Sequence, residues 1–252
     1  ALSSAASDVY KRQVRIYAQP YGYAKTNPEL EALGLPLVYN GDITYPHRSS
    51  ISAVYDRIIA DLEAAEVMMS DSYQRAGVKD QKTTVTKPVI QALMARVFLY
   101  HEDYQKAADY ATKVISNRKY TLANATAYAN MWSGSTDVSA ATGNEIIFEV
   151  YFSQADGSST NVALPLIAPV SSADKGYGDV RVSNDLLSLF TSANDVRLSL
   201  MSTTNAGYDS QYKWFSKYPG KSTSGRRDIL YNNIPVLRPV SYTHLRAHET
   251  RR

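Results

Sequence analysis

The stretch ARVFLYHEDYQKAADYATKVI, Ala95–Ile115, carries the clearest structural pattern in the chain. Apolar residues repeat at intervals of three and four on both sides of the polar triplet His101-Glu102-Asp103, which predicts two helices joined by a tight turn. Small residues stand where the two helices would touch, at Ala95, Ala107, Ala108 and Ala111. Because small side chains allow helices to approach closely, the stretch predicts a helical hairpin. Such a hairpin can be a scaffold for binding or a piece of an enzyme.

A further helix is predicted on the N-terminal side of this hairpin. Residues 51–69, ISAVYDRIIADLEAAEVMM, carry an apolar stripe at helical spacing, and Ser49 or Ser50 is the candidate cap. The first hairpin helix begins near Thr86, with Pro88 in its first turn, where a missing N–H costs little. These elements predict a mainly α fold with long irregular loops and a few short strands.

Composition excludes several classes of protein. The 252 residues are 44% hydrophobic and 20% charged, so the chain is long enough to bury a core and is not compositionally disordered. It has no apolar run of 18 residues that would predict a spanning helix. Cysteine is absent, which rules out disulfides, thiolate nucleophiles and thiolate metal sites.

The two ends differ from the middle. Residues 1–13 and 239–252 resemble translated sequencing-adapter ends, and we expect that neither is native, which leaves a domain at 14–238. These tails hold five basic and two acidic side chains, so 22 of the 27 basic and 22 of the 24 acidic residues remain. A neutral interior gives no support for a nucleic-acid partner, which needs clustered basic charge.

Two motifs are weak matches to known chemistry. In HLRAHE, His244 and His248 have the i, i+4 spacing of zinc ligands, but they lie in the C-terminal tail and in the wrong order for H-E-x-x-H. The segment PGKSTSG at 219–225 is similar to the end of a phosphate-binding loop, but Phe215 stands where the first glycine should be. We therefore predict no metal site and no cofactor.

A strand is predicted in NEIIFEVYF, residues 144–152, where apolar residues alternate. Glu145 and Glu149 share one face, which invites comparison with a glycosidase. Four strand residues separate them by roughly 13 Å, whereas paired glycosidase carboxylates lie about 5 to 9.5 Å apart. We therefore predict no catalytic residue here, and expect both glutamates to be solvated.

The helix pairs resemble tetratricopeptide repeats, but the 34-residue signature does not recur cleanly. A closer resemblance is to the SusD/RagB family of bacterial outer-membrane glycan-binding lipoproteins. The matching stretches occur in family order: GLPLVY at 34–39, YDRIIADLEAA at 55–65, TKPVIQALMARVFLYHEDYQKAADYATKVI at 86–115, YTL at 120–122, NEIIFEV at 144–150, NDLLSLF at 184–190, NDVRLSLM at 194–201 and NIPVLR at 233–238.

The resemblance implies binding without catalysis. It implies an oligosaccharide or polysaccharide ligand, a SusC-like TonB-dependent outer-membrane transporter as partner, and a lipid-anchored position on the cell surface. The family's signal peptide and lipid-modified cysteine do not occur in this chain, so we expect it to be an internal fragment of a longer protein.

Aromatic residues in two loops are the candidate ligand contacts, because sugar C–H faces pack on rings that also carry a polar tip. The loops are GYGDVR at 176–181 and GYDSQYKWFSKY at 207–218. The candidates are Trp214, Tyr212, Tyr177 and Tyr208. An alternative for Trp214 is that it anchors its loop on the core, and Trp132 is expected to be a packing residue.

Two other functions remain open. One is a tetratricopeptide-like module that binds peptides or proteins on a helical face. The other is a glycan-cleaving enzyme, which would need distant carboxylates such as Asp179 and Asp209 brought together by the fold. Asp195 and Arg197 are predicted to form a local charge pair that orders the loop after residue 190.

Overall fold

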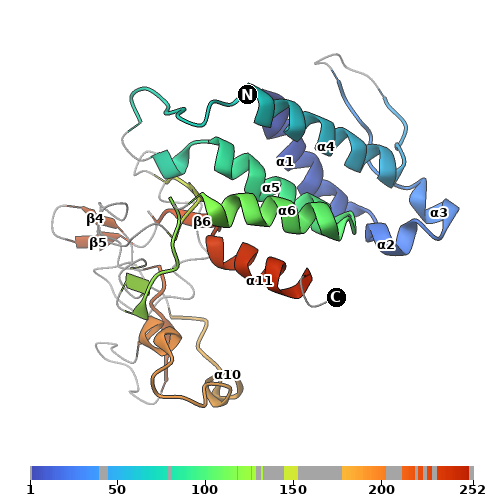
Figure 1. Cartoon of the computed structure of the whole chain (residues 1–252). Coiled ribbons are helices and arrows are strands. Elements are labelled where there is room, and N and C mark those ends of the chain that lie inside the picture. The colour runs from blue at the N-terminus through green and yellow to red at the C-terminus, as the bar shows by residue number, and fades with distance from the viewer. Residues whose placement is uncertain are drawn as a thin grey trace. The chain divides into compact units, whose positions relative to one another are not determined.

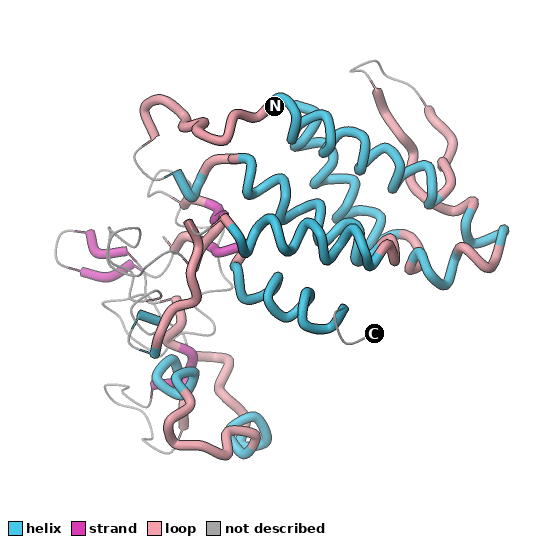
Figure 2. The backbone as a smooth tube through the Cα atoms, viewed as in Figure 1, coloured by secondary structure: helices cyan, strands magenta, loops and turns pink. Residues whose placement is uncertain are grey.

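The structure is a computed structural model, traced in Figures 1 and 2. It describes residues 2–39, 45–78, 81–117, 119–125, 127–128, 132, 145–152, 178–202, 212–218, 221–223, 226–228 and 232–249. The chain divides into two compact units. The helical unit is Ala1–Arg118 with Leu237–Arg252, and the loop unit is Lys119–Val236.

The helical unit is a row of packed helices. Its elements are α1 (Leu2–Tyr17), α2 (Tyr21–Ala24), α3 (Pro28–Glu31), α4 (Ile51–Met68), a 3-10 turn η1 (Gln81–Thr83), α5 (Lys87–Tyr100), α6 (Tyr104–Ser116) and α11 (Pro239–Glu249). Helix α1 packs on α4, α4 on α5, α5 on α6, and α6 on α11, the red helix in Figure 1. The predicted mainly α architecture with short strands is confirmed.

Capping side chains mark the starts of α4 and α6, whereas Thr86, the predicted cap of α5, forms no capping hydrogen bond with its side chain. Ser50 precedes α4, and its hydroxyl accepts a hydrogen bond from the Ala53 N–H at 3.1 Å, so the predicted cap is confirmed. Asp103 does the same for α6 by accepting from the Lys106 N–H at 3.1 Å. Between the hairpin helices, His101 is the C-cap of α5. Glu102 then has a φ of 62°, the left-handed conformation that reverses the chain.

The predicted apolar stripes form the core of this unit. Three of the four small residues of the hairpin, Ala95, Ala107 and Ala111, are completely buried, as close packing of α5 on α6 requires, whereas Ala108 is half-buried. Buried side chains along α4 and α5 include Ile51, Val54, Ile58, Leu62, Val89, Ile90, Val97 and Phe98. Their burial supplies the hydrophobic stabilisation of the helix row.

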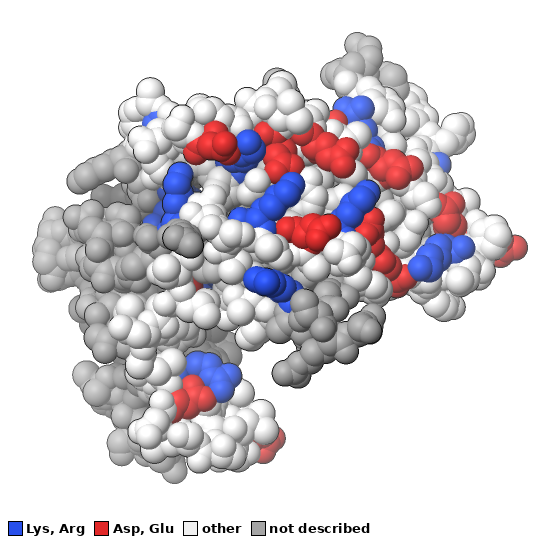
Figure 3. Space-filling model, viewed as in Figure 1, with Lys and Arg blue, Asp and Glu red and all other residues white. Residues whose placement is uncertain are grey.

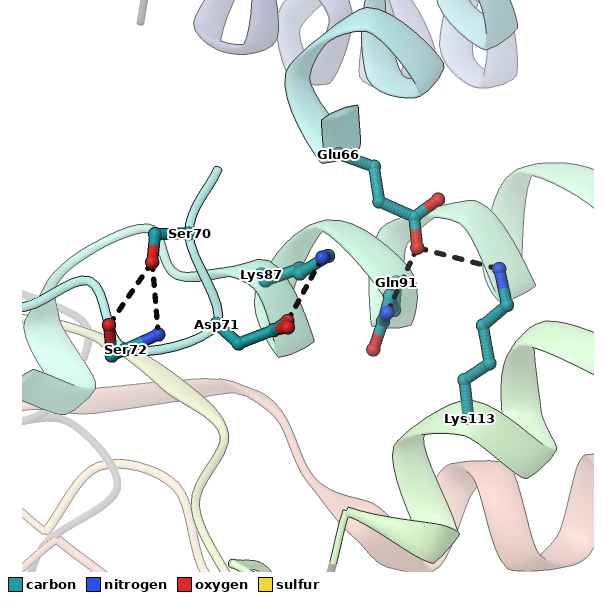
Figure 4. Close-up of polar contacts among 7 residues, drawn as sticks. All are labelled: Glu66, Ser70, Asp71, Ser72, Lys87, Gln91 and Lys113. Atoms are coloured by element: carbon teal, nitrogen blue, oxygen red, sulfur yellow. Dashed lines mark hydrogen bonds and ion pairs between the residues drawn. The ribbon is translucent and has the colours of Figure 1, made fainter. Parts of the chain in front are cut away.

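A polar network ties three of these helices together (Figure 4). Glu66 of α4 accepts hydrogen bonds from Gln91 of α5 and from the Tyr110 hydroxyl of α6, each at 2.9 Å, and pairs with Lys113 at 3.4 Å. Burial alone would raise the pKa of Glu66, but these partners outweigh burial and lower it. Acidic and basic side chains alternate over this helical face, with no purely basic patch among the described side chains drawn there (Figure 3).

The segments predicted to be non-native lie in helices. Residues 2–13 fall within α1, and residues 239–249 form α11, in which Tyr242 is completely buried. Their origin stays a prediction.

Among the described residues, no helix combines the length and the apolar character needed to cross a membrane, and no group of three metal-ligating side chains occurs.

The loop unit contains short strands and turns (Figure 2). Strand β1 (Phe148–Val150) pairs with β6 (Ile234–Leu237), and β4 (Lys221–Thr223) pairs antiparallel with β5 (Arg226–Asp228). Strand β2 (Met201–Ser202) pairs antiparallel with β3 (Trp214–Phe215), and Ser202 lies opposite Trp214. Between β1 and β2 lie α10 (Asn184–Ser188) and the 3-10 turn η3 (Val196–Leu200).

The prediction that both glutamates near β1 are solvated is wrong. Glu149 is 1% exposed and accepts a hydrogen bond from the Asn233 Nδ2 atom at 2.7 Å. Glu145 is 4% exposed and accepts from the Ala123 N–H at 2.7 Å. The alternation pattern missed this because the partners lie outside the strand, and hydrogen bonding is what makes a buried carboxylate tolerable.

Candidate functional site

Trp214 holds two segments of the loop unit together. Its indole Nε1–H donates a hydrogen bond to the Gly178 carbonyl at 2.9 Å, and its side chain is 2% exposed. Gly178 has a φ of 67°, a conformation that favours glycine. A backbone hydrogen bond from the Val182 N–H to the Lys213 carbonyl, at 2.8 Å, aligns the same two segments. The burial of Trp214 favours the anchoring alternative, and contact with a ligand stays a prediction.

Tyr212 is the exposed ring beside this anchor. It keeps 38% of its surface exposed and meets Trp214 edge to face, with ring centroids 6.5 Å apart and an interplanar angle of 76°. The guanidinium of Arg181 lies over the Tyr212 ring, 4.1 Å from its centroid. The site therefore combines an exposed aromatic ring, a guanidinium group beside it, and the buried Trp214 side chain on which the ring packs.

The other predicted contacts cannot be added to this geometry. Tyr177 and Tyr208 lie outside the described residues, as does Asp209, one of the carboxylates named for the enzyme alternative. Asp179 is described and exposed. Arg181 was not among the residues predicted from the sequence, although Arg181 is the last residue of the loop 176–181 that contains Tyr177. An arginine in a loop that carries an aromatic ring was the sequence signal that could have identified it.

A second aromatic cluster is a packing centre, as predicted for Trp132. Trp132 is 5% exposed and packs with Ile146 and Leu200. Tyr128 and Tyr218 meet its ring edge to face, at centroid distances of 6.1 and 5.7 Å. Because Trp132 is buried, this cluster offers no large aromatic surface to a ligand.

The predicted charge pair between Asp195 and Arg197 is confirmed. The Arg197 Nε and Nη2 atoms donate to the two Asp195 carboxylate oxygens at 2.9 and 2.6 Å. The Arg197 backbone N–H also donates to Asp195, at 3.0 Å. The hydrogen bonds from the Arg197 side chain, followed by that from its backbone N–H, lower the pKa of Asp195 to about 2.

This pair predicts an unusual titration. We expect the Asp195 carboxyl carbon to titrate in an NMR experiment with a midpoint of about 2, and in Arg197→Gln with a midpoint nearer its ordinary 3.8. Since the pKa is lowered by folding, the associated stability is present above the ordinary value and is lost as pH falls toward the lowered one. An unchanged midpoint in Arg197→Gln would show that the side-chain pair is not the cause.

Comparison with solved structures identifies the fold. The chain is similar to a SusD superfamily protein from Bacteroides thetaiotaomicron, with 25% identity and a TM-score of 0.74 over 98% of this chain and 52% of that one. It matches a SusD superfamily protein from Bacteroides vulgatus equally well, with the same four values. A SusD-like carbohydrate binding protein from Bacteroides vulgatus, 19% identical with a TM-score of 0.72, covers 98% of this chain and 49% of its own length, and shows the fold alone.

No family model and no curated protein sequence matches the chain. The chain spans about half the length of the SusD-like structures that it matches. The aromatic site described above lies within the matched region, because the matches cover nearly the whole of this chain.

Proposed function

We propose, from the premise that this chain has the SusD fold, that the protein binds an oligosaccharide and does not cleave it. The observation that carries the proposal is the exposed Tyr212 ring held on the buried Trp214. Support comes from the solved relatives, one of which is described as a carbohydrate binding protein and another as a laminarin binding SusD-like protein.

The chemistry of the site suits a sugar. A pyranose ring has apolar C–H faces that pack on aromatic carbon, and hydroxyls that need polar partners at the rim. Tyr212 supplies the ring, and its phenol oxygen and the Arg181 guanidinium supply polar groups beside it. The ring is held rigidly before the ligand arrives, so less entropy is lost on binding.

We further propose that the complete protein acts at the surface of the outer membrane. It would be lipid-anchored there and would deliver its glycan to a SusC-like TonB-dependent transporter in a nutrient-uptake system. The SusD fold supports this proposal through the resemblance stated above. Co-purification of the complete protein with such a transporter from outer-membrane fractions would test it, and recovery in the soluble fraction alone would contradict it.

The central prediction concerns Tyr212. We expect the full chain to bind at least one member of a panel of plant, algal and microbial oligosaccharides in isothermal titration calorimetry. In Tyr212→Ala we expect affinity to fall by about five-fold or more, since stacking on an aromatic side chain contributes about 1 kcal/mol or more. The melting temperature should stay unchanged because the ring is partly exposed.

Tyr45→Ala is the matched control for this variant. Tyr45 is 94% exposed and lies in the helical unit, so its removal should leave affinity unchanged. Equal loss in both variants, or no loss in Tyr212→Ala, would contradict the assignment of the site. An assay for new reducing ends after incubation with each bound glycan should stay at background. Product formation would contradict binding without cleavage.

A further inference from the structure

Arg181 differs from the arginines that pair with carboxylates. The Arg197 guanidinium bonds to Asp195, and the Arg57 guanidinium bonds to Asp61 at 2.9 and 3.1 Å. Within the described part of the chain, the Arg181 side chain forms no ion pair and no hydrogen bond. The Arg181 guanidinium lies over the face of Tyr212, 4.1 Å from the ring centroid, and the residue is exposed. Among the described residues, no carboxylate occupies its hydrogen-bonding fork.

Stacking on Tyr212 holds the Arg181 guanidinium in place without using its N–H groups. A guanidinium that lies over a ring is held by the ring's electrons, while its N–H groups point outward in its own plane. The backbone hydrogen bond from Val182 to Lys213 and the indole bond of Trp214 to Gly178 hold the two loop segments of this arrangement side by side. Arg181 is thus placed beside Tyr212 before any ligand binds.

A planar fork of this kind matches a carboxylate. Two parallel N–H···O bonds join a guanidinium to a carboxylate with both charge and geometric complementarity, whereas a neutral hydroxyl accepts one weaker bond. Asp179, two residues earlier, is exposed and forms no ion pair with Arg181 in the described structure. Within the described structure, the Arg181 charge is therefore not paired with Asp179, and it lies beside a ring suited to sugar stacking.

We propose that Arg181 and Tyr212 form a subsite for a uronic acid residue, so that the preferred glycans are carboxylated. This inference rests on the proposed glycan-binding function and narrows its ligand class. The sugar ring packs against the exposed part of Tyr212, and its carboxylate accepts two hydrogen bonds from Arg181.

The test compares oligosaccharides that differ only in charge. Oligogalacturonides and glucuronic-acid-substituted xylo-oligosaccharides are titrated into the full chain beside their carboxyl-reduced forms. We expect the carboxylated member of a pair to bind about ten-fold more tightly, and Arg181→Gln to remove the difference, since hydrogen bonds to charged groups are the stronger class. Arg181→Lys keeps the positive charge but loses the guanidinium fork, so this variant should retain only part of the preference for the carboxylated member.

Arg15→Gln is the control, because the Arg15 guanidinium lies over the Tyr100 ring at 4.2 Å in the helical unit and matches the stacking of Arg181. The Arg15→Gln variant should keep the full preference for carboxylated over carboxyl-reduced oligosaccharides. Equal affinity for both members of every pair, or a preference that survives Arg181→Gln, would overturn the inference while the glycan-binding function stands. Failure to bind any carboxylated or neutral glycan would overturn both.

Discussion

Replacing Trp214 with alanine should destabilise the loop unit and abolish oligosaccharide binding together. The indole is 2% exposed, so its truncation leaves a cavity that we expect to lower the free energy of unfolding by about 3–5 kcal/mol. The bond to the Gly178 carbonyl is also lost. Without this anchor, we expect the segment that carries Tyr212 to separate from the segment that carries Arg181.

Two measurements distinguish anchoring from direct ligand contact. Hydrogen exchange of the Val182 amide, which bonds to the Lys213 carbonyl, should accelerate in Trp214→Ala. Trp214→Phe keeps a buried ring but loses the indole donor. We therefore expect the free energy of unfolding to fall by about 1 kcal/mol and oligosaccharide binding to remain measurable. If Trp214→Ala keeps wild-type stability but loses binding, the indole contacts the ligand directly, and the anchoring interpretation is wrong.

Replacing Phe98 with alanine should be the most damaging single change to the helical unit. The ring is 1% exposed in the last turn of α5 and stacks on Tyr110 of α6, with centroids 5.6 Å apart. Truncation of this buried ring therefore leaves a cavity where α5 packs on α6. We expect the free energy of unfolding, measured by urea titration followed by far-UV circular dichroism, to fall by about 3–5 kcal/mol.

Val67→Ala provides the matched control in the same unit. Val67 lies near the end of α4 and is 86% exposed, so its truncation should change stability by no more than about 0.5 kcal/mol. A loss below about 1 kcal/mol in Phe98→Ala would contradict the burial of its ring.

Local features of the structure were predictable from neighbouring residues. The helical periodicity, the Ser50 cap, the His101 turn and the Asp195–Arg197 pair each depend on side chains within a few positions of one another. Such contacts follow from short spacing. A helix places residues three and four apart on one face, and Asp195 meets Arg197, two positions later, as the N-cap of the 3-10 turn η3. The fold class followed from the same periodicity.

Non-local features were not predictable in the same way. The burial of Glu149 depends on Asn233, which is 84 residues away, and the anchoring of Trp214 depends on Gly178, 36 residues earlier. A strand pattern indicates which residues share a face, but it does not indicate which face another segment will cover. Glu145 and Glu149 were misassigned for this reason.

The amino-acid pattern thus specified the helix pairs, their caps and the presence of aromatic loops, because those depend on short-range geometry. Which aromatic ring is buried and which faces solvent depended on long-range packing: Trp214 became the anchor, and Tyr212, two residues before it, kept the exposed face beside Arg181. Burial is a property of the surrounding segments, so the same residue type can serve the core or the site according to what the chain brings next to it.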